Sequence, residues 1–148
     1  MMTDIKRVVV PVDFSSTMNK VVNYGVSVAD KLGAEVLFLH VINDFNGYDM
    51  MLVHPSFMSM TKDLEQKSEE RMAALVDDYK KREHGARGHV VVGDAADEII
   101  NFAKLEKADM IIIGTHGTKG LERFLIGSTA DRVVKKAPCP VLVFNPFT

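Results

Sequence analysis

The sequence contains almost no cysteine and no long apolar run. Its 148 residues include one cysteine, Cys139, which excludes a disulfide within the chain and a zinc site built from several cysteines. No stretch approaches the roughly 20 apolar residues that span a bilayer. The apolar run before Asp13 is too short for the core of a signal peptide. We therefore expect a cytoplasmic protein that is not embedded in a membrane.

The sequence also lacks an excess of charge of one sign. Eighteen basic and 20 acidic residues give a formal net charge of -2, and no long block of like charge occurs. A broad basic surface for nucleic acid or for an anionic membrane is therefore not expected. The length and the 47% hydrophobic content are typical of one ordinary domain with a sizeable core, so we expect residues 1–148 to form a single domain.

Five short apolar runs, rich in β-branched residues, are typical of buried strands. They begin at Val8, Glu35, His89, Met110 and Pro140. The segments between them carry apolar residues at helical spacing, and the first such face consists of Val21, Gly25, Val28 and Leu32. This alternation predicts an α/β fold, in which helices cover both faces of a parallel sheet.

Candidate caps mark the starts of three of these helices. Ser15, Ser16 or Thr17 can cap the first helix, Asp94 a later one, and Gly127 or Ser128 the last. Residues 43–60 interrupt the alternation and contain four of the nine methionines. We favour a role for that segment in covering apolar surface, and a lid over a ligand or a partner-binding surface is the alternative.

A loop rich in glycine, "GTHGTKGLERFLIGSTADRVV", directly follows the fourth apolar run. Gly114 and Gly117 permit a tight turn and a close approach of the backbone to a ligand, and Gly127 does so where a helix begins. The first turn of that helix offers free N–H groups that favour a phosphate, and Ser128 and Thr129 add hydroxyl donors. An ordinary loop with a helix cap is the alternative. The stretch matches neither the Walker A motif nor the GxGxxG dinucleotide motif.

Gly114, Gly117 and the Gly127-Ser128 pair fit the pattern GxxG, nine residues, then Gly with Ser or Thr. This pattern resembles the nucleotide-binding signature of the universal stress protein family. The similarity extends over nearly the whole chain except residues 43–60. The other similar stretches are "VVVPVDFSS", "GDAADEIINFAKLEKADMIIIGTHG" and "KKAPCPVLVF".

The resemblance implies a Rossmann-like domain with a five-stranded parallel sheet in the order 3-2-1-4-5. It also implies a homodimer through the last strand, Val141 to Phe144, and a role in stress response and signalling. The implied cofactor is ATP or another adenine nucleotide, with any Mg²⁺ carried by its phosphates. The implied contacts are Pro11, Val12, Asp13 and Val41 at the adenosine, Ile113 and Gly114 along the nucleoside, and Gly117, Gly127, Ser128 and Thr129 at the phosphates.

Asp13 has two interpretations on the residues alone. A carboxylate at the end of a strand can accept hydrogen bonds from ribose hydroxyls, or it can close a turn before the next helix. Cys139 has two as well, of which inert packing is favoured over redox sensing.

Phosphoryl transfer normally requires acidic metal ligands beside a Lys or Arg, and the sequence has no paired acidic motif at the phosphate end. We therefore predict no catalytic residue, no protein metal site and at most slow ATP hydrolysis. The expected mechanism is a nucleotide-dependent shift between two conformations, with Lys119 to Ile126 as the mobile element and an unknown protein as partner. A slow Mg²⁺-dependent ATPase or phosphotransferase and a nucleotide-independent dimeric scaffold are the alternatives.

Overall fold

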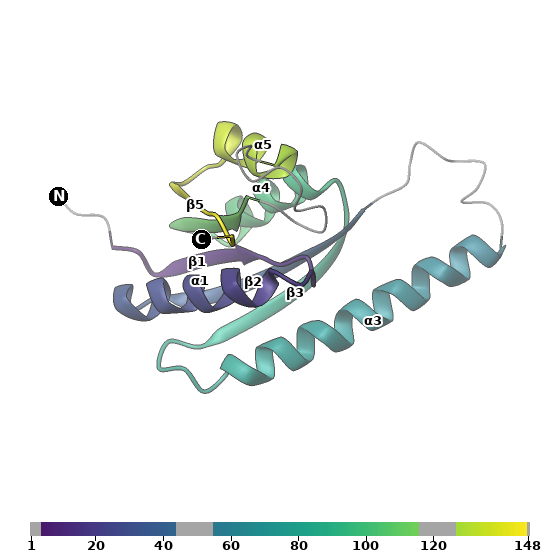
Figure 1. The fold of residues 1–148 in the computed structure, drawn as a ribbon, viewed down its shortest axis with the longest axis horizontal. Helices are drawn as coiled ribbons and strands as arrows, with labels where there is room; N and C mark the ends of the chain where they lie inside the picture. The colour runs from purple at the N-terminus through teal and green to yellow at the C-terminus, as the bar shows by residue number, and fades with distance from the viewer. Residues whose placement is uncertain (1–3, 44–54, 116–126, 148) are drawn as a thin grey trace.

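The computed structural model describes residues 4–43, 55–115 and 127–147. Five parallel strands form one sheet in the order β3-β2-β1-β4-β5 (Figure 1). The strands are β1 (Arg7–Pro11), β2 (Glu35–Asn43), β3 (Ala86–Gly93), β4 (Met110–Gly114) and β5 (Val141–Phe144). The predicted fold class and strand order are confirmed.

In the part of the chain that the structure describes, four helices cover the two faces of the sheet, as Figure 1 illustrates. They are α1 (Met18–Leu32), α3 (Pro55–Tyr79), α4 (Ala95–Leu105) and α5 (Ser128–Lys136). The core on the side of α1 and α3 includes Val10 and Phe38, whereas the core on the side of α4 includes Val9 and Leu39. Side chains alternate between the two faces of a strand, so strands with helices on both sides must be apolar throughout. Within the described ranges, no helix is long and apolar enough to cross a membrane.

The buried face of α1 differs from the predicted one. Its centre is formed by Val21, Val22, Gly25, Val26 and Ala29, while Leu32 is 43% exposed. The reason is steric, because the small residues allow the helix to lie close to β1. A Cβ built on Gly25 would lie 3.0 Å from a methyl group of Val10. The close approach therefore turns Leu32 toward the rim.

Two of the predicted helix starts are confirmed in their details. The Asp94 carboxylate accepts a hydrogen bond from the Asp97 N–H and caps α4, and Gly127 is the N-cap of α5. Thr17 precedes α1 but makes no side-chain cap bond. Part of the interrupting segment is helical, because α3 begins at Pro55, and residues 44–54 lie outside the described residues.

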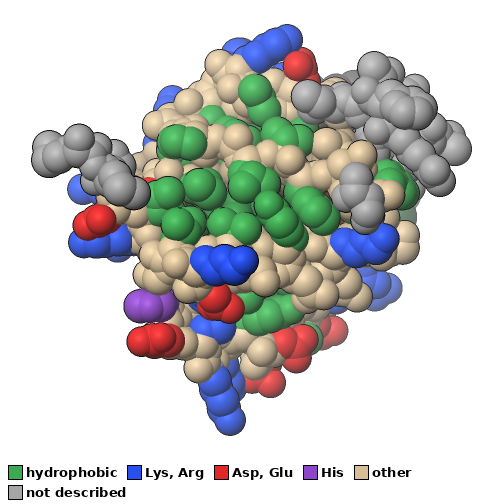
Figure 2. Space-filling view, turned by 60° about the vertical axis from the view of Figure 1, so that its left-hand side comes forward, with side chains coloured by type: hydrophobic (Ala, Val, Ile, Leu, Met, Phe, Trp, Pro, Cys, Tyr) green, Lys and Arg blue, Asp and Glu red, His purple; other side chains and the backbone are tan. Residues whose placement is uncertain are grey.

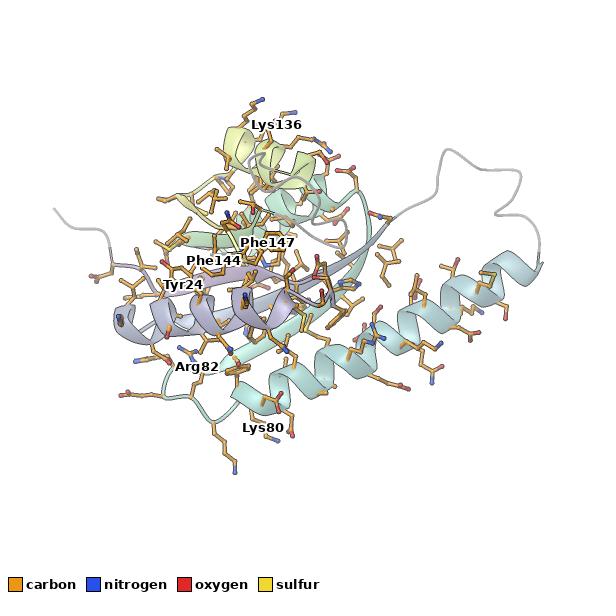
Figure 3. All side chains as sticks on the ribbon, viewed as in Figure 1. Tyr24, Lys80, Arg82, Lys136, Phe144 and Phe147 are labelled. Carbon is orange, nitrogen blue, oxygen red and sulfur yellow. The ribbon has the colours of Figure 1, made fainter. Side chains whose placement is uncertain are left out.

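A largely buried arginine side chain connects the end of α1 with the turn that precedes β3. The Arg82 side chain is 8% exposed, and its Nε and Nη2 donate to Asp30 Oδ1 at 2.9 and 2.6 Å. The same guanidinium donates to the carbonyls of Ala34 and Gly85. This one side chain therefore satisfies two turn carbonyls and a carboxylate. Figure 3 labels it together with Lys80, which belongs to an exposed ion pair with Asp77.

We predict that Arg82→Ala lowers the free energy of unfolding by about 2–3 kcal/mol, because several charge-assisted hydrogen bonds are lost and two carbonyls are left without their donor. Arg82→Lys should recover only part of this loss, since an ammonium cannot reproduce the forked geometry. The measurement is urea unfolding at pH 7. Lys80→Ala serves as the control and should leave the midpoint unchanged. Equal midpoints for Arg82→Ala and the wild type would contradict the assigned role.

A second arginine joins the middle of α5 to the start of α4. The two ends of the Arg132 guanidinium donate to Asp94 at 2.9 Å and to Asp97 at 2.8 Å. The backbone hydrogen bond from Asp97 and the charge of Arg132 hold the pKa of Asp94 below its ordinary value of 3.8. The lowered pKa means that the folded state favours the ionised carboxylate. The associated stability is thus present above that ordinary pKa and is lost as the pH falls through the folded value.

We predict that Asp94→Ala lowers the free energy of unfolding by about 1 kcal/mol at neutral pH, the usual effect of losing a helix N-cap. Its difference from the wild type should shrink as the pH falls below about 4, because the wild-type carboxylate then becomes protonated. Asp94→Asn keeps a capping oxygen without the charge and should lie between the two at pH 7. Unfolding curves from pH 3 to pH 7 test this, and a pH-independent difference for Asp94→Ala would refute it.

Candidate functional site

A cavity of about 320 Å³ lies where the chain leaves the carboxyl ends of β1 and β4. The two strands are neighbours, with Val8 opposite Met110 and Val9 opposite Ile111. β1 continues into α1 on one face of the sheet, whereas α5, which follows β4, lies toward the other face (Figure 1). Parallel sheets leave a crevice at such a reversal of strand order, and ligands bind there.

Nine of the ten predicted site residues line this cavity. They are Pro11, Val12, Asp13, Val41, Ile113, Gly114, Gly127, Ser128 and Thr129. The tenth, Gly117, lies outside the described residues, as does the stretch from Lys119 to Ile126. Segments far apart in the sequence thus meet around one hollow, while the role of each residue toward a ligand stays a prediction.

Sequence reasoning missed part of the wall. The additional lining residues are Thr17, Met18, Val21, Leu39, Ala95, Ile99, Thr115 and Ala130. Most are apolar residues at the ends of helices or strands, and periodicity assigns such residues to the core. Val21, Ile99 and Ala130 carry the helical spacing of a buried face and also form cavity wall. Thr115 had a usable signal, because it directly follows Gly114 in the glycine loop.

The backbone N–H and C=O of Val41 point toward the carboxyl end of β1, which borders the cavity. The Glu35 N–H bonds the Lys6 carbonyl, and the Leu39 carbonyl accepts from the Val12 N–H. Backbone groups alternate between the two neighbours of a strand, so the N–H and C=O of Val41 point the same way as those of Leu39. Among the backbone bonds of the described residues, the β1–β2 ladder ends at the Val12–Leu39 bond. Beyond the last hydrogen bond of the β1–β2 ladder, Val41 therefore offers one backbone donor, its N–H, and one backbone acceptor, its C=O.

Asp13 turns the chain at this end of the cavity. Its Oδ1 accepts a hydrogen bond from the Ser15 N–H at 3.0 Å, which closes the turn before α1. The next residue, Phe14, has a φ of 56°, an uncommon conformation for a bulky side chain. The turn interpretation of Asp13 is confirmed. It is compatible with the ligand interpretation, since the carboxylate lines the cavity and has a second oxygen.

The opposite end of the cavity is held by the backbone of Thr115. Its N–H donates to the Phe144 carbonyl and its carbonyl accepts from the Gly127 N–H, both at 2.9 Å. A Cβ on Gly127 would lie 2.5 Å from that carbonyl oxygen. Gly127 has an ordinary φ of -58°, so close approach rather than backbone conformation requires the glycine. These bonds bring the end of β4 to the start of α5.

The start of α5 supplies polar groups to this end. The first backbone bond of the helix runs from the Asp131 N–H to the Gly127 carbonyl, so the N–H groups of Ser128 and Thr129 have no partner within the helix. Thr115 adds a hydroxyl whose oxygen is buried and has no hydrogen-bond partner among the described residues. A buried hydroxyl left unpaired costs free energy, which a ligand or a water at this position would recover.

Two other candidate groups show no sign of reactivity. Burial, and to a smaller extent the charge of Asp109, raises the pKa of the Cys139 thiol, which disfavours the thiolate and supports the packing interpretation. In residues 4–43, 55–115 and 127–147, no three His, Cys, Asp or Glu side chains are grouped so as to hold a metal ion.

Comparison with known proteins relates this chain to one protein family. The model of the universal stress protein family matches residues 4–145. A universal stress protein of Methanocaldococcus jannaschii is 34% identical in an alignment of 142 positions, which covers 93% of this chain and 81% of the relative.

Two solved structures share the fold. UspA from Lactobacillus plantarum has a TM-score of 0.79 at 23% identity, over 97% of this chain and 99% of that one. A family protein of Arabidopsis thaliana, solved with AMP bound, has a TM-score of 0.60 at 19% identity, over 95% of this chain and 91% of that one. At such identities the likeness concerns the fold alone. The family match and the archaeal relative carry the assignment: the chain belongs to the universal stress protein family.

Proposed function

We propose that this single-domain protein binds ATP or another adenine nucleotide in the cavity, in the cytoplasm. We further propose that the bound state changes its conformation or its partner binding in the stress response. One observation carries the proposal: the cavity has an unpaired strand backbone at one end and the start of a helix at the other. A nucleotide has the matching order of groups, with a planar base at one end and anionic phosphates at the other.

The base end favours adenine over guanine. Adenine carries a hydrogen-bond acceptor at N1 beside a donor at N6, and guanine carries a donor at N1 beside an acceptor at O6. The N–H of Val41 matches the adenine N1 and its C=O matches the N6 amino group. Apolar side chains of Leu39, Ile99 and Ile113 line the same cavity and offer surface for the base. Asp13, in the neighbouring turn, also lines the cavity, and in this proposal its carboxylate accepts hydrogen bonds from the ribose hydroxyls.

The phosphate end is the start of α5. Ser128 and Thr129 contribute hydroxyls and free backbone N–H groups, and the helix dipole adds a partial positive charge. Their hydrogen-bonding groups fit phosphate oxygens, and a bound Mg²⁺ would be carried by the phosphates. The Arabidopsis relative solved with AMP supports the class of ligand at the level of the family.

The experiment that tests the proposal is native mass spectrometry of the purified chain, followed by calorimetric titration with ATP, ADP, AMP and GTP. Binding of the adenine nucleotides with weaker binding of GTP supports the proposal. A protein that neither contains nor binds any adenine nucleotide would favour the scaffold alternative. Release of ADP from bound ATP over hours with Mg²⁺ would identify a slow ATPase.

We predict that Ser128→Ala weakens ATP binding about fivefold to tenfold, because one hydrogen bond to a charged phosphate is lost, while adenosine binding is unchanged. Titration of both ligands measures the difference. Ser27→Ala, which removes an exposed hydroxyl on α1, is the matched control and should bind both as the wild type does. An equal loss for ATP and adenosine would show that Ser128 does not face the phosphates.

We also propose that β5 pairs with β5 of a second copy to form a homodimer. β5 is an edge strand, and the Pro140 and Phe144 carbonyls bond to β4. By alternation, Val141 and Val143 direct their backbone groups to the open edge. Tyr24 stacks on Phe144 with ring centroids 4.5 Å apart, and Figure 3 shows Phe147 nearby. Figure 2, in which the left-hand side of Figure 1 is turned forward, shows hydrophobic side chains gathered in the middle of the face in view.

We predict that Val143→Pro converts the dimer to a monomer in light scattering, because proline removes an outward N–H while leaving the carbonyl bonds to β4 intact. The matched control is Val92→Pro on β3, the other edge strand. Val92 is 41% exposed. The Gly85 carbonyl accepts from the Val36 N–H of β2, so by alternation along β3 the backbone groups of Val92 point away from β2, toward the open edge. The control should remain dimeric. A dimer that persists in Val143→Pro would exclude pairing through β5.

A further inference from the structure

His40 lies on β2 directly before Val41 and is not among the residues that line the cavity. Its Nδ1 lies 2.8 Å from the Val12 carbonyl oxygen. A carbonyl can only accept a hydrogen bond, so Nδ1 carries the proton and donates it. The imidazole thus bonds to the last residue through which β1 is held to β2.

This bond occupies the place of the next rung of the ladder. The Val12 N–H donates to the Leu39 carbonyl, and in a continued parallel ladder the Val41 N–H would donate to the Val12 carbonyl. The His40 imidazole supplies a donor to that carbonyl instead. The Val12 carbonyl, in the residue that follows β1, thereby has a donor without the Val41 N–H.

The imidazole is held from its other side by an aromatic contact. The rings of Phe14 and His40 have centroids 4.6 Å apart and are tilted by 48°. The guanidinium carbon of Arg71, on α3, lies 5.8 Å from the centroid of the Phe14 ring. Phe14 has its uncommon φ of 56° in the turn where β1 leaves the sheet. Phe14, whose ring contacts His40, therefore belongs to the turn in which the chain leaves β1 and ends its pairing with β2.

We propose that His40 is a positioning residue of the base site. By donating to the Val12 carbonyl it keeps the Val41 N–H available to a ligand. Without the imidazole, that carbonyl accepts from Val41, the ladder gains one rung, and the cavity loses its donor. The identity of the ligand rests on the proposed function, whereas the competition for the Val12 carbonyl is a property of the empty protein.

The first test therefore uses no ligand. Amide hydrogen exchange of Val41 is measured by NMR in the wild type, His40→Leu and His40→Asn. We expect Val41 in His40→Leu to be protected at least about tenfold more than in the wild type, because it gains a backbone bond. Asn can offer an amide donor in place of Nδ1, so His40→Asn should restore wild-type exchange. Unchanged exchange in His40→Leu would overturn the proposal.

Two further variants distinguish this effect from a general loss of stability. His89→Leu removes another partly buried histidine of the sheet, whose Nδ1 has no hydrogen-bond partner among the described residues, and it should leave Val41 exchange unchanged. Thermal unfolding checks that each variant is folded. If His40→Leu fails to fold, His40→Phe keeps an aromatic ring against Phe14 without the donor, and the same increase in protection is expected.

The second test uses AMP and 1-deaza-AMP, which lacks the N1 acceptor. The wild type should bind AMP about tenfold more tightly than the analogue, and His40→Leu should bind both equally weakly. A His40→Leu protein that discriminates as well as the wild type would overturn the role of His40. A wild type that binds neither compound would instead overturn the proposed function, and the exchange measurement would still decide the role of His40.

Discussion

The last rung between β1 and β2, from the Val12 N–H to the Leu39 carbonyl, is the constraint on which the site depends. β1 ends at Pro11, while β2 continues to Asn43 and stays paired with β3 on its other side. The difference in length leaves the backbone of Val41 without a strand neighbour on one side. Had β1 continued for two more residues, the ladder would have closed the space that now forms the base end of the cavity.

Several local features stop β1 at this point. The carboxylate of Asp13 closes a turn on the Ser15 N–H, and Phe14 adopts a positive φ that no strand accommodates. Pro11 lacks an N–H, but this costs little, because the pairing of β1 with β4 ends at Val9. The features that end β1 therefore also open the base end of the cavity, and the helix that follows contributes Met18 and Val21 to the cavity wall.

Much of the fold was predictable because it depends on patterns that a sequence displays. Apolar runs bounded by polar segments gave the five strands, and Asp94 and Gly127 marked the starts of their helices. The site residues of β1, β2, β4 and α5 came from motif spacing within a family resemblance, and nine of them line one cavity. The buried face of α1 was misplaced, because the close approach of Gly25 to Val10 depends on a neighbour that no periodicity specifies.

The roles of His40 and Thr115 required coordinates for a similar reason. A histidine in an apolar strand carries no signal that its ring replaces a backbone donor. The importance of Thr115 lies in its backbone, whose two hydrogen bonds reach Phe144 and Gly127 from distant parts of the chain. Both residues act through long-range hydrogen bonds that involve main-chain groups, which side-chain patterns do not encode.

Thr115 also connects the two surfaces that the proposed function requires. One of its backbone bonds ends on β5, the strand proposed to pair with a second copy, and the other ends at the start of α5, where the phosphates are proposed to bind. A ligand that alters the Thr115–Gly127 bond therefore acts on the same residue whose N–H bonds to the end of β5. Linkage is reciprocal, so a change in dimerisation caused by nucleotide must be matched by an equal change in nucleotide affinity caused by dimerisation. The short path through Thr115 offers a physical route for that coupling.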